Sequence, residues 1–163
     1  MAREFGATVI ATVGSETEMA AAKSIGAKTV ANFRSEDYVS ELTDHIGTAS
    51  VDVVVDVEFG ENVADYLPLL KDNSVIASYS SSRQPNPEIA FYDLMFRNIF
   101  VHPILVYSMP EDAKINAKRD INTLLSSGAI SHRISHTLPL DNIVDAHALI
   151  ENGCKGSVVV EIE

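Results

Sequence analysis

The sequence predicts an α/β protein built on a doubly wound parallel sheet with helices on both of its faces. Strand-like and helix-like segments alternate through the first half of the chain, which is the order expected of such a sheet. The strand-like runs cover residues 8–13, 28–33, 51–57 and 74–79. The first of them is β-branched or small and apolar between Gly6 and Gly14, which is typical of a strand buried on both faces.

The helices between these strands carry their own start and stop signals. Ser15 precedes Glu18 by three residues, a capping-box pattern that begins the first helix. The second helix, over residues 35–46, has an apolar stripe on one face. The third, over residues 61–72, contains Pro68, which we expect to kink or divide it.

The second half of the chain continues with elements of both kinds. A strand over residues 99–107 is interrupted by Pro103, which suits an edge strand or a bulge. Ser108 and Glu111 form another capping-box pattern, which opens a long helix. The remaining elements are a loop over 81–87, a short helix over 91–98, a strand over 132–140, a helix over 141–153 and a strand over 157–162.

Composition limits the partners of this protein. The chain has 163 residues, enough for a packed core, and a formal net charge of -11, which repels nucleic acids and anionic lipid. No apolar run approaches the ~20 residues of a membrane span, and the first residues do not resemble a secretory signal. We therefore expect a cytoplasmic protein with neither a nucleic acid nor a membrane partner.

Several motifs occur in an order that resembles a known family. The runs "GATVIATVGSE", "VDVVVDVEFG", "SVIASYSS" and "LPLDNIVDAHALIENG" resemble the medium-chain dehydrogenase/reductase superfamily. The nearest branch is the NADPH-dependent quinone oxidoreductases, zinc-free relatives of the zinc alcohol dehydrogenases. The resemblance extends over essentially the whole chain. It implies NADP(H) as the cofactor, a quinone or related carbonyl compound as the substrate, and no metal.

The same resemblance implies that part of the family fold has no counterpart here. Residues 8–13 match the second strand of the nucleotide-binding unit, so the first strand and its glycine-rich turn are expected to be missing. In the Rossmann strand order 3-2-1-4-5-6 that strand is central, and the pyrophosphate rests on the helix after it. We therefore expect an incomplete Rossmann sheet, weak or absent NADP(H) binding, and open strand edges through which the chain forms homo-oligomers.

The resemblance also divides the chain into two parts. Residues 1–107 match a partial dinucleotide-binding domain. Residues 108–163 match a C-terminal helix and strand segment that, in the family, packs with the N-terminal catalytic domain.

The cofactor positions implied by the family lie after the strands. Gly14 and Ser15 follow the first strand of this chain and Phe33 and Arg34 follow the second, where the family contacts the adenosine ribose and its 2′-phosphate. The guanidinium of Arg34 suits a phosphate, although a solvated Arg at a strand end remains an alternative. Ser15 is equally explained as a helix cap.

Further cofactor positions follow the later strands, because open α/β sheets bind ligands at the carboxyl ends of their strands. Glu58 replaces a small or apolar residue of the family, and its carboxylate would weaken phosphate binding unless it points to solvent. Tyr107 is also explained as a core or interface aromatic residue. These positions are Val57, Glu58, Tyr79, Ser80, Leu105 and Tyr107.

Other polar residues offer no catalytic group. His132 and His136 would lie about 13 Å apart on a strand, too far to share one metal ion. Cys154, the one cysteine, is best explained as a small thiol with no metal role. Asp56 is as suited to capping a neighbouring backbone as to chemistry, and we identify no catalytic acid and base pair.

Three functional hypotheses remain. The first is a partial NAD(P)H-dependent oxidoreductase that transfers hydride to a quinone or related carbonyl compound and is inactive as an isolated chain. The second is a non-enzymatic remnant that associates with itself through its exposed strands. The third, a nucleoside-binding methyltransferase, predicts an acidic residue after the first strand, where this chain has Gly14 and Ser15.

Overall fold

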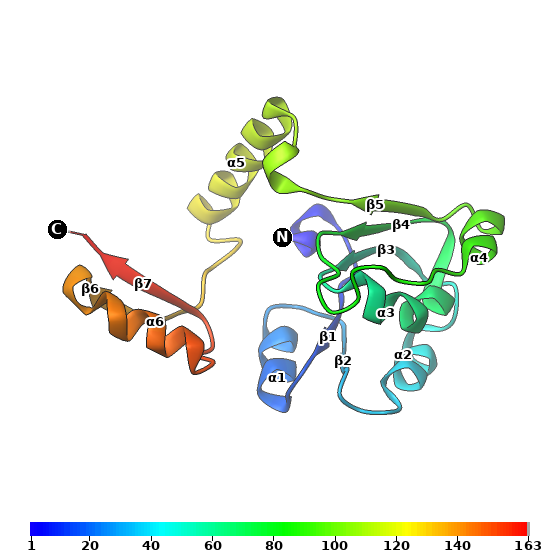
Figure 1. Cartoon of the computed structure of the whole chain (residues 1–163), viewed down its shortest axis with the longest axis horizontal. Helices are drawn as coiled ribbons and strands as arrows, with labels where there is room; N and C mark the ends of the chain where they lie inside the picture. The colour runs from blue at the N-terminus through cyan, green and yellow to red at the C-terminus, as the bar shows by residue number, and fades with distance from the viewer. Residues whose placement is uncertain (163) are drawn as a thin grey trace. The chain divides into compact units, whose positions relative to one another are not determined.

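The computed structural model describes residues 1–162 and contains two compact units, Ala2–Lys114 and Ile115–Glu163. The larger unit carries the first five strands and the smaller unit the last two (Figure 1). Helix α5 (Glu111–Ser126) runs across the boundary. The expected strand and helix alternation is present throughout, so the α/β fold class is confirmed.

All strand pairs of the larger unit are parallel. Strand β1 (Ile10–Val13) pairs with β2 (Thr29–Asn32). A second sheet has β4 (Leu70–Ser78) in its centre, flanked by β3 (Val51–Asp56) and β5 (Phe100–Pro103). The helices that follow the first four strands are α1 (Glu16–Ser24), α2 (Tyr38–Ile46), α3 (Phe59–Tyr66) and α4 (Phe91–Phe96).

The parallel strands form two sheets because β1 and β3 do not pair within residues 1–162. The break lies between the second and fourth strands of the family order, where that order places its first strand. One backbone edge of β1 and one of β3 are therefore unpaired in the part of the chain that the structure describes.

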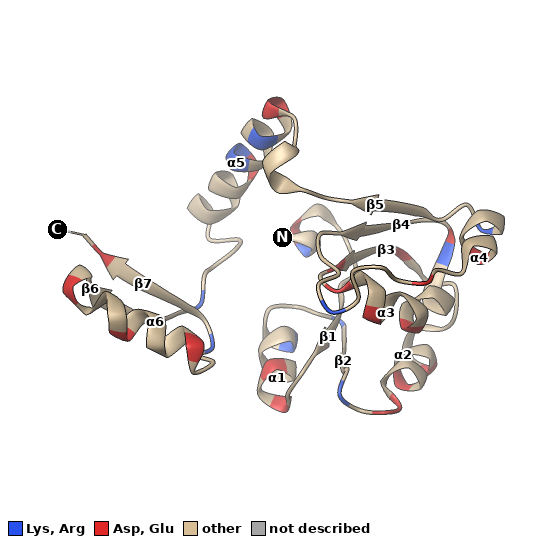
Figure 2. Cartoon of the chain, in the orientation of Figure 1, with Lys and Arg blue, Asp and Glu red and all other residues tan. Residues whose placement is uncertain are grey.

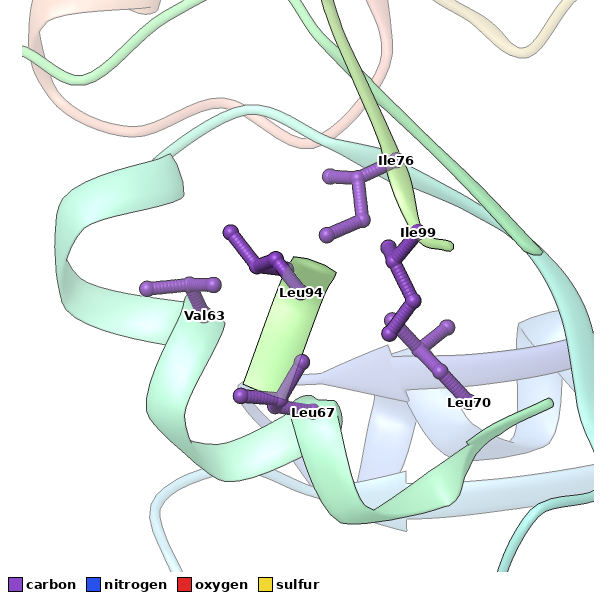
Figure 3. Close-up of a cluster of buried hydrophobic side chains, with 6 residues drawn as sticks. All are labelled: Val63, Leu67, Leu70, Ile76, Leu94 and Ile99. Carbon is purple, nitrogen blue, oxygen red and sulfur yellow. The ribbon is translucent and has the colours of Figure 1, made fainter. Parts of the chain in front are cut away.

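A buried apolar cluster joins the three-stranded sheet to its two helices (Figure 3). Leu70 and Ile76 on β4 have no exposed surface and occupy its centre. Val63 of α3 and Leu94 of α4 pack against them from the helix side. The cluster consists of Val63, Leu67, Leu70, Ile76, Leu94 and Ile99.

The opposite face of the same sheet is largely exposed. Val55 is 74% exposed, and Val53 on the same side of β3 and Val57 directly after the strand are also exposed. The physical reason is that α3 and α4 contact the sheet on the side of Val54 and Ile76.

The expectation of a strand buried on both faces, made for residues 8–13, is wrong. No residue of β1 is buried, and Thr12 is exposed. Among the described residues β1 pairs only with β2, so one of its edges has no neighbouring strand.

Two expected elements differ from the structure near prolines. Helix α3 ends at Tyr66, and Leu67–Leu69 form a 3-10 turn that leads directly into β4 at Leu70. The predicted helix over 61–72 therefore ends before Pro68, because proline lacks the N–H that would continue it. Residues 70–72 belong to β4, so the helix prediction is wrong there. Strand β4 begins four residues earlier than predicted and shifts register after its first pair with β3.

The second difference concerns the strand predicted over residues 99–107. Strand β5 ends at Pro103, and Val106–Ser108 form a short 3-10 helix. Since β5 pairs only with β4 among the described strands, Pro103 lies on an edge strand, as its missing N–H requires. Residues 104–107 are therefore not a strand.

The smaller unit is a parallel strand pair with one crossover helix. Strands β6 (Ile134–Pro139) and β7 (Ser157–Glu161) pair in parallel, and α6 (Ile143–Glu151) connects them. All three were predicted with bounds within a few residues. Over residues 1–162, no helix is both long enough and apolar enough to cross a membrane.

Candidate nucleotide-binding site

The carboxyl ends of β1 and β2 bring four of the predicted cofactor positions together. A Cβ atom on Gly14 would lie 3.1 Å from Cζ of Phe33 and 3.4 Å from Nε of Arg34. The parallel pairing produces this proximity, because Val13 and Asn32 are paired at the ends of their strands. Ser15 follows Gly14 directly, so the four positions form one local cluster at this edge.

Ser15 has the capping role that its spacing predicted. It is the N-cap of α1, and its Oγ accepts a hydrogen bond from the N–H of Glu18 at 3.3 Å. The Glu18 carboxylate in turn accepts the N–H of Gly14 at 3.0 Å. The capping explanation is confirmed, and one N–H that faces the candidate site is already bonded to a carboxylate.

Arg34 supplies the positive charge of this cluster. Its backbone N–H donates to Oδ1 of Asn32 at 3.0 Å, which fixes the turn after β2. Its side chain is exposed and lies beside Gly14 at the ends of β1 and β2.

The ends of β3 and β4 form a second cluster with four further predicted positions. The Tyr79 N–H donates to the carbonyl of Asp56 at 3.2 Å, and the Phe59 N–H donates to the carbonyl of Ser80 at 3.0 Å. These bonds place Val57 and Glu58 beside Tyr79 and Ser80, as parallel pairing predicts. The side chains of Val57 and Tyr79 are exposed.

The Glu58 carboxylate forms hydrogen bonds with the segment that follows β4. Its Oε1 accepts the backbone N–H of Arg83 at 2.7 Å, and its Oε2 accepts the hydroxyl of Ser82 at 2.9 Å. These bonds lower the pKa of Glu58, with the Arg83 N–H as the largest cause. The carboxylate thus binds the segment after β4.

Sequence reasoning missed this segment as a structural partner. Gly60 lies so close to it that a Cβ atom would be 2.6 Å from the carbonyl oxygen of Gln84. The Gly60 N–H also donates to Oγ of Ser81 at 2.9 Å. The one available signal was a glycine directly before the helix predicted over residues 61–72, since such a glycine suggests a turn or a close backbone approach.

Asp56 has a structural role at the end of β3. It is only 4% exposed, and its carboxylate accepts the Glu58 N–H at 2.9 Å and Nδ2 of Asn62 at 2.8 Å. The hydroxyl of Tyr66 donates to the same carboxylate at 3.0 Å. Of the two explanations open for Asp56, capping of a neighbouring backbone agrees with this geometry.

Two tyrosines in this region hold their protons more strongly than usual. Burial raises the pKa of Tyr66 far above its ordinary value, and the nearby Asp56 charge adds to the effect. Burial likewise raises the pKa of Tyr38, whose hydroxyl donates to the carboxylate of Asp65. Both phenols are donors to carboxylates, so neither serves as a base.

The last two predicted positions follow β5. Leu105 precedes the short 3-10 helix, and Tyr107 lies within it with 88% of its surface exposed. The Lys114 ammonium donates to the carbonyl of Tyr107 at 3.2 Å. The alternative explanation of Tyr107 as a core aromatic is therefore wrong within this chain.

Acidic side chains outnumber basic ones in this chain. Asp and Glu occur on α1, α2, α3 and α6, with fewer Lys and Arg (Figure 2). The formal net charge of -11 opposes anions at long range. Within residues 1–162 there is no group of three His, Cys, Asp or Glu side chains that could hold a metal ion.

The fold and the strand-end clusters define an α/β domain of the dinucleotide-binding type. The family model described as "Zinc-binding dehydrogenase" matches residues 1–121. This protein therefore belongs to the zinc-binding dehydrogenase family, and the resemblance deduced from its motifs is confirmed.

Three known proteins illustrate the relationship. A 2-haloacrylate reductase of Burkholderia sp is 27% identical over 150 residues, which cover 90% of this chain and 45% of the reductase. A crystal structure of 2-haloacrylate reductase has a TM-score of 0.84 at 26% identity. The match covers 99% of this chain and 52% of the chain in that structure. A quinone oxidoreductase of Pongo abelii is 22% identical over 155 residues, 94% of this chain and 46% of its own. CurA from Vibrio vulnificus, in complex with NADPH, has a TM-score of 0.79 at 20% identity over 99% of this chain and 51% of its own.

The matches cover different shares of this chain and of its relatives. The chain spans about half the length of the curated relatives it matches, whereas the relatives match nearly all of the chain. The relatives therefore contain about as many residues again that have no counterpart in this chain of 163 residues.

Proposed function

We propose that this chain is the nucleotide-binding part of an NADPH-dependent reductase that acts on quinones or related electron-poor carbonyl compounds. Support comes from the family membership, from relatives that are a quinone oxidoreductase and a 2-haloacrylate reductase, and from a structural neighbour that binds NADPH. The observation that carries the proposal is the cluster at the ends of β1 and β2, which places the Arg34 side chain beside Gly14.

The predicted residues have distinct roles in this proposal. Gly14, Ser15, Phe33 and Arg34 contact the adenosine end of the coenzyme, and Arg34 binds its 2′-phosphate. The remainder of the coenzyme lies across the ends of the later strands, where it is lined by Val57, Glu58, Tyr79, Ser80, Leu105 and Tyr107. When bound, NADPH supplies the hydride, and these side chains orient it rather than transfer protons.

The affinity of the isolated chain for the coenzyme is expected to be weak. The chain contains no GxGxxG turn, which in Rossmann folds carries the diphosphate on the following helix. The first turn of α3 is not a substitute, because its N–H groups are bonded to Asp56, Ser80 and Ser81. Without that electrostatic site, the isolated chain is expected to have no turnover.

Nucleotide titration tests this proposal. NADPH and NADH are titrated into the wild-type chain and into Arg34→Ala, with Arg119→Ala as a control that removes an exposed Arg elsewhere. We expect weak saturable NADPH binding that Arg34→Ala reduces about tenfold, the scale of one charged phosphate contact, with NADH binding unchanged. Absence of saturable binding in the wild-type chain would refute the proposal.

A second candidate function is self-association without nucleotide binding. It is favoured by the unpaired edges of β1 and β3 and by the exposed valines of β3. Unpaired strand edges are templates for pairing with another chain. Analytical ultracentrifugation that shows a dimer, together with no NADPH binding, would support this candidate over the first.

A further inference from the structure

The segment after β4, residues 79–84, forms hydrogen bonds with the first turn of α3. The Phe59 N–H donates to the carbonyl of Ser80, and the Gly60 N–H donates to Oγ of Ser81. The Ser81 hydroxyl then donates to the carbonyl of Gln84 at 2.6 Å, which closes the turn. The segment therefore contacts the first turn of α3 through both backbone and side-chain groups.

The carboxylate of Glu58 occupies the centre of this contact. Both of its oxygens accept hydrogen bonds, one from the Arg83 N–H and one from the Ser82 hydroxyl, at 2.7 and 2.9 Å. Hydrogen bonds to an ionised carboxylate are stronger than those between neutral groups. One side chain at the end of β3 thus binds two successive residues of a segment 24 and 25 positions later.

Glycine at position 60 makes this approach feasible. A Cβ atom there would lie 2.6 Å from a backbone oxygen and 2.8 Å from Oγ of Ser81, which is closer than real Cβ contacts. Gly60 and Glu58 therefore act together, since the first permits the segment to approach and the second binds it.

We propose that Glu58 is a positioning residue that holds residues 79–84 against α3 and thereby sets the positions of Tyr79 and Ser80 at the carboxyl end of β4. The coenzyme part of this inference rests on the proposed function, in which Tyr79 and Ser80 contact the nucleotide. In this role Glu58 acts through the segment, because both of its carboxylate oxygens accept hydrogen bonds from Ser82 and Arg83.

The charges around Glu58 set the pH range in which its carboxylate binds Ser82 and Arg83. The Arg83 guanidinium faces it from the segment and pairs with Glu61 of α3 at 3.1 Å. The Asp56 carboxylate faces the same turn from β3 and accepts the Glu58 N–H. The pKa of Glu58 is lowered from 4.5, chiefly by the Arg83 N–H. The contact is therefore intact above pH 4.5 and is lost as the pH falls through that lowered pKa.

Amide hydrogen exchange measured by NMR tests the holding role without any nucleotide. Glu58→Ala is compared with Glu58→Gln, which keeps one acceptor oxygen. The control is Glu61→Ala, which removes a carboxylate from α3 and with it the ion pair between Glu61 and Arg83. We expect Glu58→Ala to speed exchange of the Arg83 amide about tenfold, Glu58→Gln to restore part of the protection, and Glu61→Ala to change it by less than about twofold.

The pH dependence provides a second readout. In the wild-type chain, protection of the Arg83 amide should fall with the same midpoint as the carboxyl ¹³C shift of Glu58, and this step should be absent in Glu58→Ala. Equal Arg83 protection in wild type and Glu58→Ala would overturn the holding role.

Coenzyme binding then separates this inference from the proposed function. NADPH affinity should fall in Glu58→Ala and recover in part in Glu58→Gln. Unchanged affinity in a Glu58→Ala chain whose segment is loosened would overturn the link to Tyr79 and Ser80. Absence of NADPH binding in the wild-type chain would refute the proposed function and that link together, while the exchange result would still decide whether Glu58 holds the segment.

Discussion

The two faces of the three-stranded sheet should respond very differently to the loss of a side chain. Ile76 has no exposed surface and lies in the cluster formed with α3 and α4. Val55, on the neighbouring strand, is 74% exposed. Truncation of each residue to alanine therefore compares a covered face with an uncovered one in the same sheet.

The magnitudes follow from burial. Ile76→Ala removes fully buried carbon atoms and leaves a cavity, so it should lower the free energy of unfolding by about 2–5 kcal/mol. Val55→Ala removes two methyl groups of which about a quarter is buried, so at ~0.8 kcal/mol per carbon it should lower that free energy by about 0.4 kcal/mol. The loss of a β-branched side chain adds a few tenths of a kcal/mol to the second value.

Urea unfolding followed by circular dichroism measures both values. The measurement is made at low and high protein concentration, because an associated state would make the midpoint depend on concentration. A loss of more than about 2 kcal/mol in Val55→Ala, the scale of a buried residue, would refute the reasoning. That outcome would mean that another copy of the chain covers this face and would favour the self-association candidate.

Three further outcomes are expected from the local geometry. Ser15→Ala should lower the free energy of unfolding by about 1 kcal/mol through loss of the α1 cap, and an unchanged urea midpoint would contradict this. Gly60→Ala should loosen the segment after β4, so limited proteolysis should cleave it faster than in the wild type, and equal cleavage rates would argue against the close approach. In alkaline titration followed by phenolate absorbance, Tyr66→Phe should remove a late phase of ionisation, because burial raises the pKa of Tyr66 far above its ordinary value. Because the pKa of Tyr66 is raised in the folded chain, its contribution to stability is complete below the ordinary value of 10.0 and is lost as the pH rises above it; loss of an early phase in Tyr66→Phe would contradict this assignment.

Local chemistry accounts for most of the elements that were predicted. The Ser15 cap depends on a side chain and an N–H three residues apart, so a short pattern is enough to identify it. Pro68 and Pro103 limited α3 and β5 because proline removes the N–H that a helix or a central strand needs. The proximity of the residues after β1 and β2, and of those after β3 and β4, was also predictable, because parallel strands bring their carboxyl ends to one edge.

Other features depended on what packs against each element. The apolar run over residues 8–13 predicted burial on both faces, yet no residue of β1 is buried. On β3, Val55 is exposed because the apolar cluster forms on one side of the sheet. Apolarity shows that a face can be buried but does not identify what covers it. The partners of Glu58 are likewise 24 and 25 residues away, beyond the reach of any local pattern.

The sequence by itself determined the order of strands and helices, the helix cap at Ser15 and the family, since these depend on residue identity and short spacing. Tertiary structure decided which face of β3 is buried, that Asp56 caps the turn after its strand, and that Glu58 binds residues 82 and 83. The physical reason is that burial and hydrogen bonding between distant segments depend on how the whole chain packs, and no single segment contains that information.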